Sequence, residues 1–195
     1  MTNRSFEDCT WLNGPASWSL HDAALRVVTD ERTDFWRETH YGFTRDNGHF
    51  FGYPTDGDFT AQLRVRARYE ELYDQAGLMV RIDEANWVKA GIELSDGKAL
   101  LSSVLTIGGS DWATGVFADD PAEFWMRASV VNGVLRLQAS ADGTTWPLLR
   151  LAPFPQRASY WVGPMCCTPE RAGLEVVFSD FQVGPPLDRD LHDLT

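Results

Sequence analysis

Hydrophobic and polar residues alternate along most of the chain, with the two-residue period of strands that bury one face. The segment AEFWMRASVVNGVLRLQAS, residues 122–140, has two such runs on either side of an Asn-Gly pair, a dipeptide typical of two-residue hairpin turns. Pairing outward from this turn places Trp125 opposite Ser140 and Ser129 opposite Arg136. Because one face of the hairpin is then apolar and the other polar, the segment predicts one layer of an antiparallel sandwich.

A second hairpin is predicted for NWVKAGIELSDGKALLSSVLT, residues 86–106, with its turn at the Asp-Gly pair. Trp87, Lys89 and Glu93 share one face of its first strand. In the preceding run AGLMVRID, Arg81 alternates with apolar residues in the same way. The residues of the second hairpin that are expected to point into the core are Val88, Ala90, Ile92 and Leu94, with Ala99, Leu101 and Leu105.

The remaining pattern predicts more strands and very little helix. Further strands are expected at residues 24–28, 58–69, 145–151, 160–164 and 173–183. No 3.6-residue stripe is longer than about three turns, so helix is expected only in short connections such as Tyr69–Tyr73. The pattern is that of an all-β fold, an antiparallel β-sandwich forming one domain over residues 1–184. The acidic tail, residues 185–195, is expected to leave the core.

Charge and composition narrow the classes of partner. The 195 residues include 28 acids and 17 bases, which gives a net charge of −11. Nucleic acids and anionic membranes attract basic patches, so neither is an expected partner. A neutral ligand such as a sugar, or a protein, is compatible with this charge. Eight tryptophans are many, and we expect some of them at a surface or in a groove.

The sequence also favours a cytoplasmic protein. Its beginning, MTNRSFEDCTW, lacks the apolar run of a signal peptide, and no stretch approaches the ~20 apolar residues of a membrane span. The three cysteines, Cys9, Cys166 and Cys167, are odd in number, and two are adjacent. We expect reduced thiols, with the adjacent pair buried and structural.

The segment FWRETHYGFTRDNGHFFG, residues 35–52, has the composition of an active site. Its own Asn-Gly pair predicts a hairpin with Asp46 opposite His49 and with His40 about three positions further along the same face. At ~3.4 Å per residue, the two histidines are too far apart to share a metal ion. We therefore expect no metal site, and Asp46 and His49 are expected to brace the turn. No motif in the chain indicates a cofactor.

Signatures of catalysis are weak. The strand motif E-x-D-x-x-E of sandwich-type retaining glycosidases is absent, which leaves Glu38, Asp83 and Glu93 as conceivable acids for a glycosidase pair. There is no G-x-S-x-G segment, and no glycine-rich loop precedes the helix of a phosphate site. We therefore predict no catalytic residues, and a cryptic glycoside-processing enzyme is the enzymatic alternative.

Aromatic and hydrogen-bonding side chains lie on the faces that point away from the predicted core. This mixture is typical of sugar sites, because an aromatic ring packs under the C–H face while Arg, Asp, Glu or Gln bind the hydroxyls. The alternative is an ordinary cross-strand charge ladder, with Arg81, Lys89 and Glu93 on a solvated face. The residues expected to stack on a sugar are Trp36, Trp87 and Trp125.

Several blocks of the sequence resemble the DUF1349 family, which is also called the regulation of enolase family. These blocks include TDFWRETHYGFTRDNGHFFG, AGLMVRIDEANWVKAGIELSDG, SDWATG, FWMRAS, SADGTTWPLLRLAPF and VGPMC. The resemblance covers roughly residues 5–183 and implies a concanavalin A-like (jelly-roll) β-sandwich. The AGLMVRIDEANWVKAGIEL block is also similar to accessory sandwich domains of some β-xylosidases.

The function expected from these observations is non-catalytic recognition of a carbohydrate or a sugar-containing metabolite. The resemblance implies an alternative, which is regulatory binding to a metabolic enzyme such as enolase. Most site candidates come from the family blocks DFWRETHYGFTRDNGHF and AGLMVRIDEANWVKAGIE. With two residues of the 122–140 hairpin added, the candidate ligand-binding residues are Asp34, Trp36, Arg37, His40, Tyr41, Arg45, His49, Arg81, Trp87, Lys89, Glu93, Trp125 and Arg127.

Overall fold

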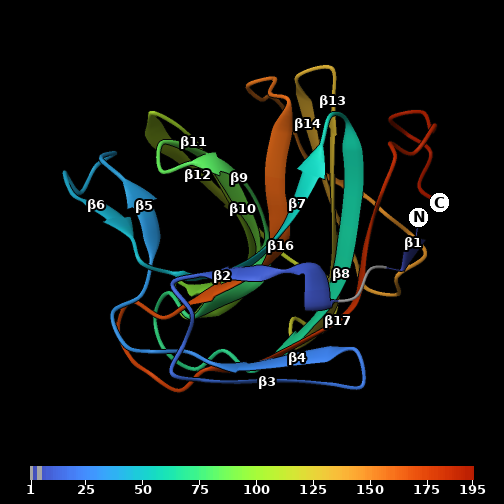
Figure 1. The fold of residues 1–195 in the computed structure, drawn as a ribbon. Helices are drawn as coiled ribbons and strands as arrows, with labels where there is room; N and C mark the ends of the chain where they lie inside the picture. Colours follow the sequence, from blue (N-terminus) through green and yellow to red (C-terminus); the bar gives the residue numbers. More distant parts are fainter. Residues whose placement is uncertain (1, 4–5) are drawn as a thin grey trace.

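The computed structural model describes residues 2–3 and 6–195, and most of this chain forms two stacked antiparallel sheets (Figure 1). The predicted all-β antiparallel sandwich is therefore confirmed. The first sheet has eight strands, in the order β15 (Leu148–Pro153), β14 (Val134–Ser140), β13 (Glu123–Val131), β8 (Phe59–Ala67), β17 (Glu175–Gly184), β4 (Ala24–Val28) and β3 (Ser17–His21), with β1 (Thr2–Asn3) paired to β17. The second has seven, in the order β12 (Gly109–Gly115), β11 (Lys98–Ile107), β10 (Asn86–Ser95), β9 (Gln75–Asp83), β16 (Ser159–Cys167), β7 (His49–Asp56) and β2 (Thr10–Leu12).

Two small elements stand apart from these sheets: a hairpin of β5 (Phe35–Arg37) and β6 (Thr44–Asp46), and a 3-10 turn, η1 (Phe6–Asp8). The short helix expected at Tyr69–Tyr73 is not formed. Asp74 instead accepts hydrogen bonds from the backbone N–H groups of Glu70 and Glu71, at 2.9 and 3.1 Å, which closes a turn. In the described part of the chain, no helix is long and apolar enough to cross a membrane.

The register of both predicted sheet hairpins is confirmed. In β13–β14, Trp125 lies opposite Ser140. In β10–β11, Leu94 lies opposite Ala99, on either side of the Asp-Gly turn. The two central residues of each turn have positive φ, as the type I′ turn requires, so local turn chemistry was sufficient to set the pairing.

The main core lies between the two sheets. Val88, Ala90 and Ile92 of β10 contribute to it from one side, and Met126 and Ala128 of β13 from the other, and all five are buried. The two-residue alternation therefore assigned the inward faces of these strands correctly, because successive side chains of a strand point to opposite faces.

A second, smaller apolar cluster lies on the outer face of the seven-stranded sheet, beneath the β5–β6 hairpin. Figure 1 shows this hairpin beside β9–β12. Because the β5–β6 hairpin covers the outer face, Lys89 and Glu93 are only 4% and 6% exposed. The alternative of a solvated charge ladder on this face is therefore wrong. The members of the cluster are Phe35, Trp36, Phe50, Met79, Trp87, Val104, Met165 and Cys167.

The hairpin expected around Asn47-Gly48 is not formed. Instead, β6 pairs with β5, and His49 begins β7, which lies between β16 and β2. The physical reason is a contact with an earlier segment of the chain. The carbonyl of Asp34 accepts hydrogen bonds from the N–H groups of Asn47 and Gly48, at 3.0 and 2.9 Å, so the chain leaves the small hairpin at this pair and enters the sheet.

The acidic tail after β17 returns to the eight-stranded sheet. Arg136 of β14 donates hydrogen bonds to the carbonyls of Leu191 and Asp193, at 3.0 and 3.4 Å. The carbonyl of Leu194 accepts one from the N–H of Trp146, at 2.8 Å. The tail has irregular backbone, but these bonds hold it against the outer face of β14 instead of letting it leave the sandwich.

Candidate ligand-binding site

The β5–β6 hairpin is held over the sheet by charged side chains. Arg81 of β9 forms two hydrogen bonds with the Asp46 carboxylate, at 2.7 and 2.8 Å. At the other strand, the N–H of Arg37 donates to the Ser110 hydroxyl at 2.9 Å, and its guanidinium donates to the carbonyl of Gly108 at 2.8 Å. Bidentate Arg–carboxylate pairs are geometrically specific, so these contacts set the position of the hairpin.

A buried ion pair connects the start of the hairpin to the floor beneath it. The Lys89 ammonium donates to the Asp34 carboxylate at 3.0 Å, and its side chain is 4% exposed. Burial lowers the pKa of Lys89, but the charge of Asp34 and its neighbours more than offsets this effect and holds the pKa above its ordinary value. The N–H of Phe35 also donates to Asp34, at 2.8 Å. Lys89 is therefore a fixed cation and not a nucleophilic amine.

Glu93 is a second buried charged group, four positions along β10. Its carboxylate accepts hydrogen bonds from the Ser102 hydroxyl at 2.6 Å and from the Trp112 indole at 3.2 Å. Burial raises the pKa of Glu93, and Lys89 and these donors offset only part of the effect. Both donors are neutral, so the carboxylate is oriented but not paired with a cation at contact distance.

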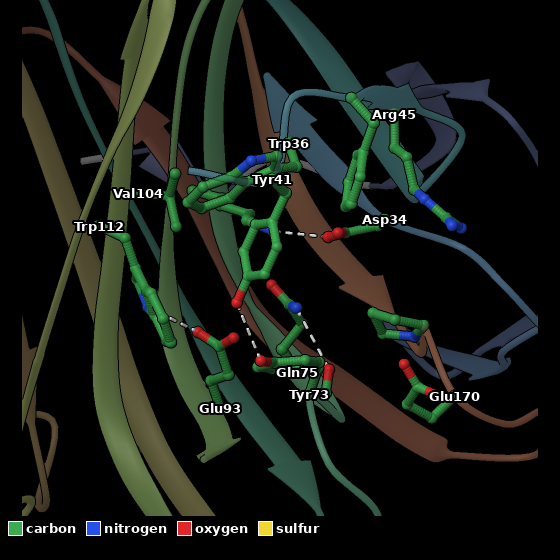
Figure 2. A pocket seen from close by; sticks show the side chains of 13 residues that line it. Asp34, Trp36, Tyr41, Arg45, Tyr73, Gln75, Glu93, Val104, Trp112 and Glu170 are labelled. Atoms are coloured by element: carbon green, nitrogen blue, oxygen red, sulfur yellow. Dashed lines mark hydrogen bonds and ion pairs between the residues drawn. The ribbon is translucent and has the colours of Figure 1, made fainter. Parts of the chain in front are cut away.

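Aromatic side chains wall a cavity of about 190 Å³ above these groups. Trp36 comes from β5, Tyr41 from the hairpin loop, Trp112 from β12, and Tyr73 from the segment before β9. Figure 2 shows the Tyr41 ring reaching down to Tyr73, where the two hydroxyls lie 3.2 Å apart. This hydrogen bond raises the pKa of Tyr73 to about 12, so its hydroxyl is neutral at physiological pH.

The mouth of the cavity is more exposed and carries both signs of charge. The Arg45 guanidinium lies over the Phe43 ring, 5.1 Å from its centroid. Figure 2 shows Glu170 across the mouth from Arg45, and Pro169 also lines the cavity. A ligand that enters therefore passes an arginine and a glutamate before it meets the aromatic walls.

Sheet register explains why distant parts of the sequence meet in this cavity. Lys89 lies opposite Val104, and Val104 lies opposite Trp112, so these three residues form one row across three strands. Glu93 lies opposite Gln75 on the neighbouring strand β9. Residues directly opposite each other in a ladder have Cβ atoms only ~5 Å apart, which brings their side chains onto one patch.

Sequence reasoning missed several residues of the cavity. Gln75 could have been found by extending the alternation of Met79 and Arg81 backwards along β9. Trp112 could have been found from the SDWATG block and the expected strand pairing. No local signal indicated Pro169 and Glu170, which reach the cavity only through the fold. The missed lining residues are Phe43, Tyr73, Gln75, Val104, Trp112, Pro169 and Glu170.

The structure brings six of the thirteen candidate residues into this cavity, namely Asp34, Trp36, Tyr41, Arg45, Lys89 and Glu93. Arg37 and Arg81 instead anchor the hairpin. Trp87 is 1% exposed and packs against Phe35, with ring centroids 6.0 Å apart, so it offers no free face to a sugar. His40 lies exposed in the hairpin loop against Tyr41, with ring centroids 4.8 Å apart.

His49 has a structural role and does not pair with Asp46. Its Nε2 accepts a hydrogen bond from the N–H of Asp30 at 3.0 Å, so the proton is on Nδ1, which donates to the carbonyl of Asn13 at 2.6 Å. The side chain is 2% exposed. His49 therefore joins two loops from inside the protein, and the expectation that it braces a turn with Asp46 is wrong.

Trp125 and Arg127 lie on the outer face of the other sheet, away from the cavity. The Arg64 guanidinium covers the Trp125 ring at 4.8 Å, and Arg127 stacks on the buried Trp146 at 3.7 Å. The polar faces of the two predicted hairpins therefore belong to opposite sides of the sandwich and do not line one groove.

The acids considered for a glycosidase pair lie in three different places. Glu93 lines the cavity. Asp83 closes the β9–β10 turn by accepting hydrogen bonds from the Asn86 side chain, at 2.8 and 3.1 Å. Glu38 lies in the hairpin loop beside Thr44. Within residues 2–3 and 6–195, no group of three or more His, Cys, Asp or Glu side chains is placed to hold a metal ion.

Comparisons with known proteins add to this geometry. The family model described as "Protein of unknown function (DUF1349)" matches residues 11–186. The Saccharomyces cerevisiae protein "Regulation of enolase protein 1" is 58% identical over 193 residues, which are 99% of this chain and 98% of the relative. The crystal structure of a functionally unknown protein from Saccharomyces cerevisiae, 58% identical, superposes with a TM-score of 0.93 over 94% of this chain and 100% of that chain.

A more distant structure shares the same sandwich. A mutant of the GH43 protein BlXynB from Bacillus licheniformis superposes with a TM-score of 0.71 at 14% identity, over 92% of this chain and 37% of that longer chain. At this identity the likeness shows the fold alone, which is the expected concanavalin A-like jelly roll.

Proposed function

The chain belongs to the DUF1349 family of proteins of unknown function, and from the geometry of its own cavity we propose that it binds a carbohydrate or a sugar-containing metabolite without catalysing a reaction on it. The observation that carries this proposal is the cavity of about 190 Å³ under the β5–β6 hairpin. Its walls are aromatic, and hydrogen bonds hold the polar groups of its floor. A sugar fits such a site, because its C–H faces pack on rings and its hydroxyls bond to polar side chains.

The size of the cavity supports a small ligand. Sites for drug-sized molecules have volumes of ~300–1,000 Å³, so a cavity of about 190 Å³ suits a single sugar ring. The cytoplasm is the proposed compartment, which is supported by three cysteines that are free and buried.

We expect Tyr41→Ala to weaken sugar binding about tenfold, because it removes one wall of the cavity while leaving the ion pair and the sheet intact. Titration of tryptophan fluorescence with a panel of neutral monosaccharides measures this, since Trp36 and Trp112 line the cavity. Trp18→Ala is the matched control. Trp18 and Tyr41 are each 46% exposed, but Trp18 lies on β3 of the other sheet, so its loss should leave binding unchanged.

Two results would contradict the proposal. One is the absence of any fluorescence response to the panel when the protein is folded. The other is an equal loss of affinity in the Tyr41→Ala and Trp18→Ala proteins, which would place the binding elsewhere.

A second candidate function is the regulation of a metabolic enzyme. The observation that favours it is the 58% identical relative named "Regulation of enolase protein 1". We expect this chain to co-elute with purified enolase in size-exclusion chromatography and to change the rate of the enolase reaction. Aldolase, another glycolytic enzyme, should be unaffected under the same conditions. Separate elution together with an unchanged enolase rate would exclude this candidate.

A further inference from the structure

The four aromatic walls of the cavity form a box. The Trp36 ring meets the Tyr41 ring at 72°, with centroids 5.5 Å apart, and the Trp112 ring at 89°, with centroids 6.3 Å apart. Trp112 in turn meets Tyr73 at 72° and 6.3 Å. The hydrogen bond between the Tyr73 and Tyr41 hydroxyls closes the series at 3.2 Å. We call these four residues the aromatic box.

Rings arranged in this way surround a compact group on several sides. Neighbouring rings at steep angles leave a narrow space between them, in addition to the ring faces on which a sugar can pack. Three neighbouring ring pairs of the box have centroids 5.5–6.3 Å apart, so a group seated between such rings lies within the ~6 Å over which a ring face attracts a cation. The box therefore has the dimensions of a site for one positively charged nitrogen.

When Glu93 is ionised, the buried side chains beside the box, Asp34, Lys89 and Glu93, carry two negative charges and one positive charge. Lys89 is neutralised by Asp34, at 3.0 Å. Glu93 adjoins the box through the Trp112 indole, and among the residues that the structure describes, no Lys, Arg or His nitrogen lies within 4.0 Å of its carboxylate. Arg45, the other cation of the cavity, lies at the mouth over Phe43. A cation in the box would offset the desolvation that raises the pKa of Glu93.

We propose that the ligand of this cavity carries a cationic nitrogen, which is held in the aromatic box next to Glu93. The ligand is then a small molecule with an amino or methylammonium group, such as an amino sugar or a choline-like compound. This inference rests on the proposed function, because it requires that the cavity is a ligand site, and it adds the charge of the group that the box selects.

The test uses pairs of ligands that differ only in charge. Choline is compared with 3,3-dimethylbutan-1-ol, in which a quaternary carbon replaces the ammonium nitrogen, and glucosamine is compared with glucose. Isothermal titration calorimetry of the full chain measures each affinity. We expect at least one cationic member to bind about tenfold more tightly than its neutral counterpart. The choline and glucosamine arms show whether a methylammonium group or an amino sugar is preferred.

Two variants connect that preference to the box. Glu93→Gln keeps the shape and the hydrogen-bond acceptor, so it should weaken the cationic ligand about tenfold and leave the neutral one unchanged. Tyr41→Leu, at an exposed position, keeps apolar contact but removes a ring face, and it should also reduce the cationic preference. Thermal unfolding checks that each variant is folded. If the Glu93→Gln protein does not fold, the Tyr41→Leu protein still tests the inference.

The outcomes separate this inference from the proposed function. The inference of a cationic ligand would be overturned if both members of each pair bound with equal affinity. If Tyr41→Ala then abolished the binding of both, the cavity would remain the site of a neutral ligand. Binding of glucose without any binding of choline or glucosamine would also overturn the inference of a cationic ligand and leave a neutral ligand site in place. Failure of all four compounds to bind the folded protein would overturn the cationic ligand, and the wider panel of neutral sugars then decides the proposed function.

Discussion

Replacement of Gly77 by alanine is expected to lower the free energy of unfolding by about 3 kcal/mol, although alanine is the smallest possible addition. Gly77 lies opposite Gly91 in the β9–β10 pair. A Cβ atom at Gly77 would lie 1.9 Å from the backbone carbonyl oxygen of Ala90. Backbone in the middle of a seven-stranded sheet cannot move aside as a side chain can, so the two strands must separate. Urea denaturation monitored by circular dichroism measures the change.

The expected loss of stability in Gly77→Ala is opposite in sign to the usual effect of a Gly→Ala substitution. At a position with ordinary φ and free space, Gly→Ala stabilises a protein by ~0.4–1 kcal/mol, because it restricts the unfolded chain. Gly115→Ala at the end of β12 is the matched control, since no atom beyond Gly115 and its two chain neighbours lies within 4 Å of the added Cβ. A Gly77→Ala protein as stable as the Gly115→Ala protein would show that β9 and β10 do not approach as closely as described.

Removal of Asp34 is expected to cost about 3–5 kcal/mol of unfolding free energy, because it leaves the Lys89 ammonium buried without its partner. Both side chains are largely buried, at 4% exposure for Lys89 and 14% for Asp34. We therefore expect Asp34→Ala to unfold at a much lower temperature than the parent protein. Glu70→Ala is the control. Its ion pair with Arg171 is 68% exposed on the glutamate side, so its loss should cost at most ~1 kcal/mol.

A double substitution tests whether the uncompensated charge is the cause. Replacing Lys89 by methionine in the Asp34→Ala protein removes the orphaned charge and keeps most of the side-chain volume, so a large part of the stability should return. If the double variant is no more stable than Asp34→Ala alone, the loss comes from the contacts of Asp34 with the hairpin backbone and not from Lys89.

The parts of the fold that sequence reasoning predicted well depend on local rules. The hairpins at 86–106 and 122–140 were placed in the correct register, because an Asp-Gly or Asn-Gly turn fixes the pairing of the strands that flank it. The same rule failed at Asn47-Gly48. There the backbone N–H groups of Asn47 and Gly48 donate to the carbonyl of Asp34, which lies much earlier in the sequence than the residues of a two-residue turn. The chain after this pair therefore enters a different sheet.

The candidate site was predicted in part for a similar reason. Lys89 and Glu93 could be assigned to one face of a strand, since their spacing is a property of that strand. Alternation could not show that a hairpin from residues 35–46 covers this face and turns it into the floor of a cavity. Trp87 shows the consequence: on the same face, it is buried under the hairpin instead of being free to stack on a ligand.

The order of residues along this chain was enough to establish an antiparallel sandwich, the inward faces of its central strands and the residue types available for binding. These follow from the two-residue period and from turn chemistry, which act between neighbours in the sequence. Only the packed structure decided which aromatic rings stand around one space, and that the buried Glu93 carboxylate is bonded to neutral donors and not to a cation among the described residues. Such groupings depend on contacts between segments far apart in the chain, such as Tyr41 with Tyr73 and Trp36 with Trp112, and no local pattern encodes them.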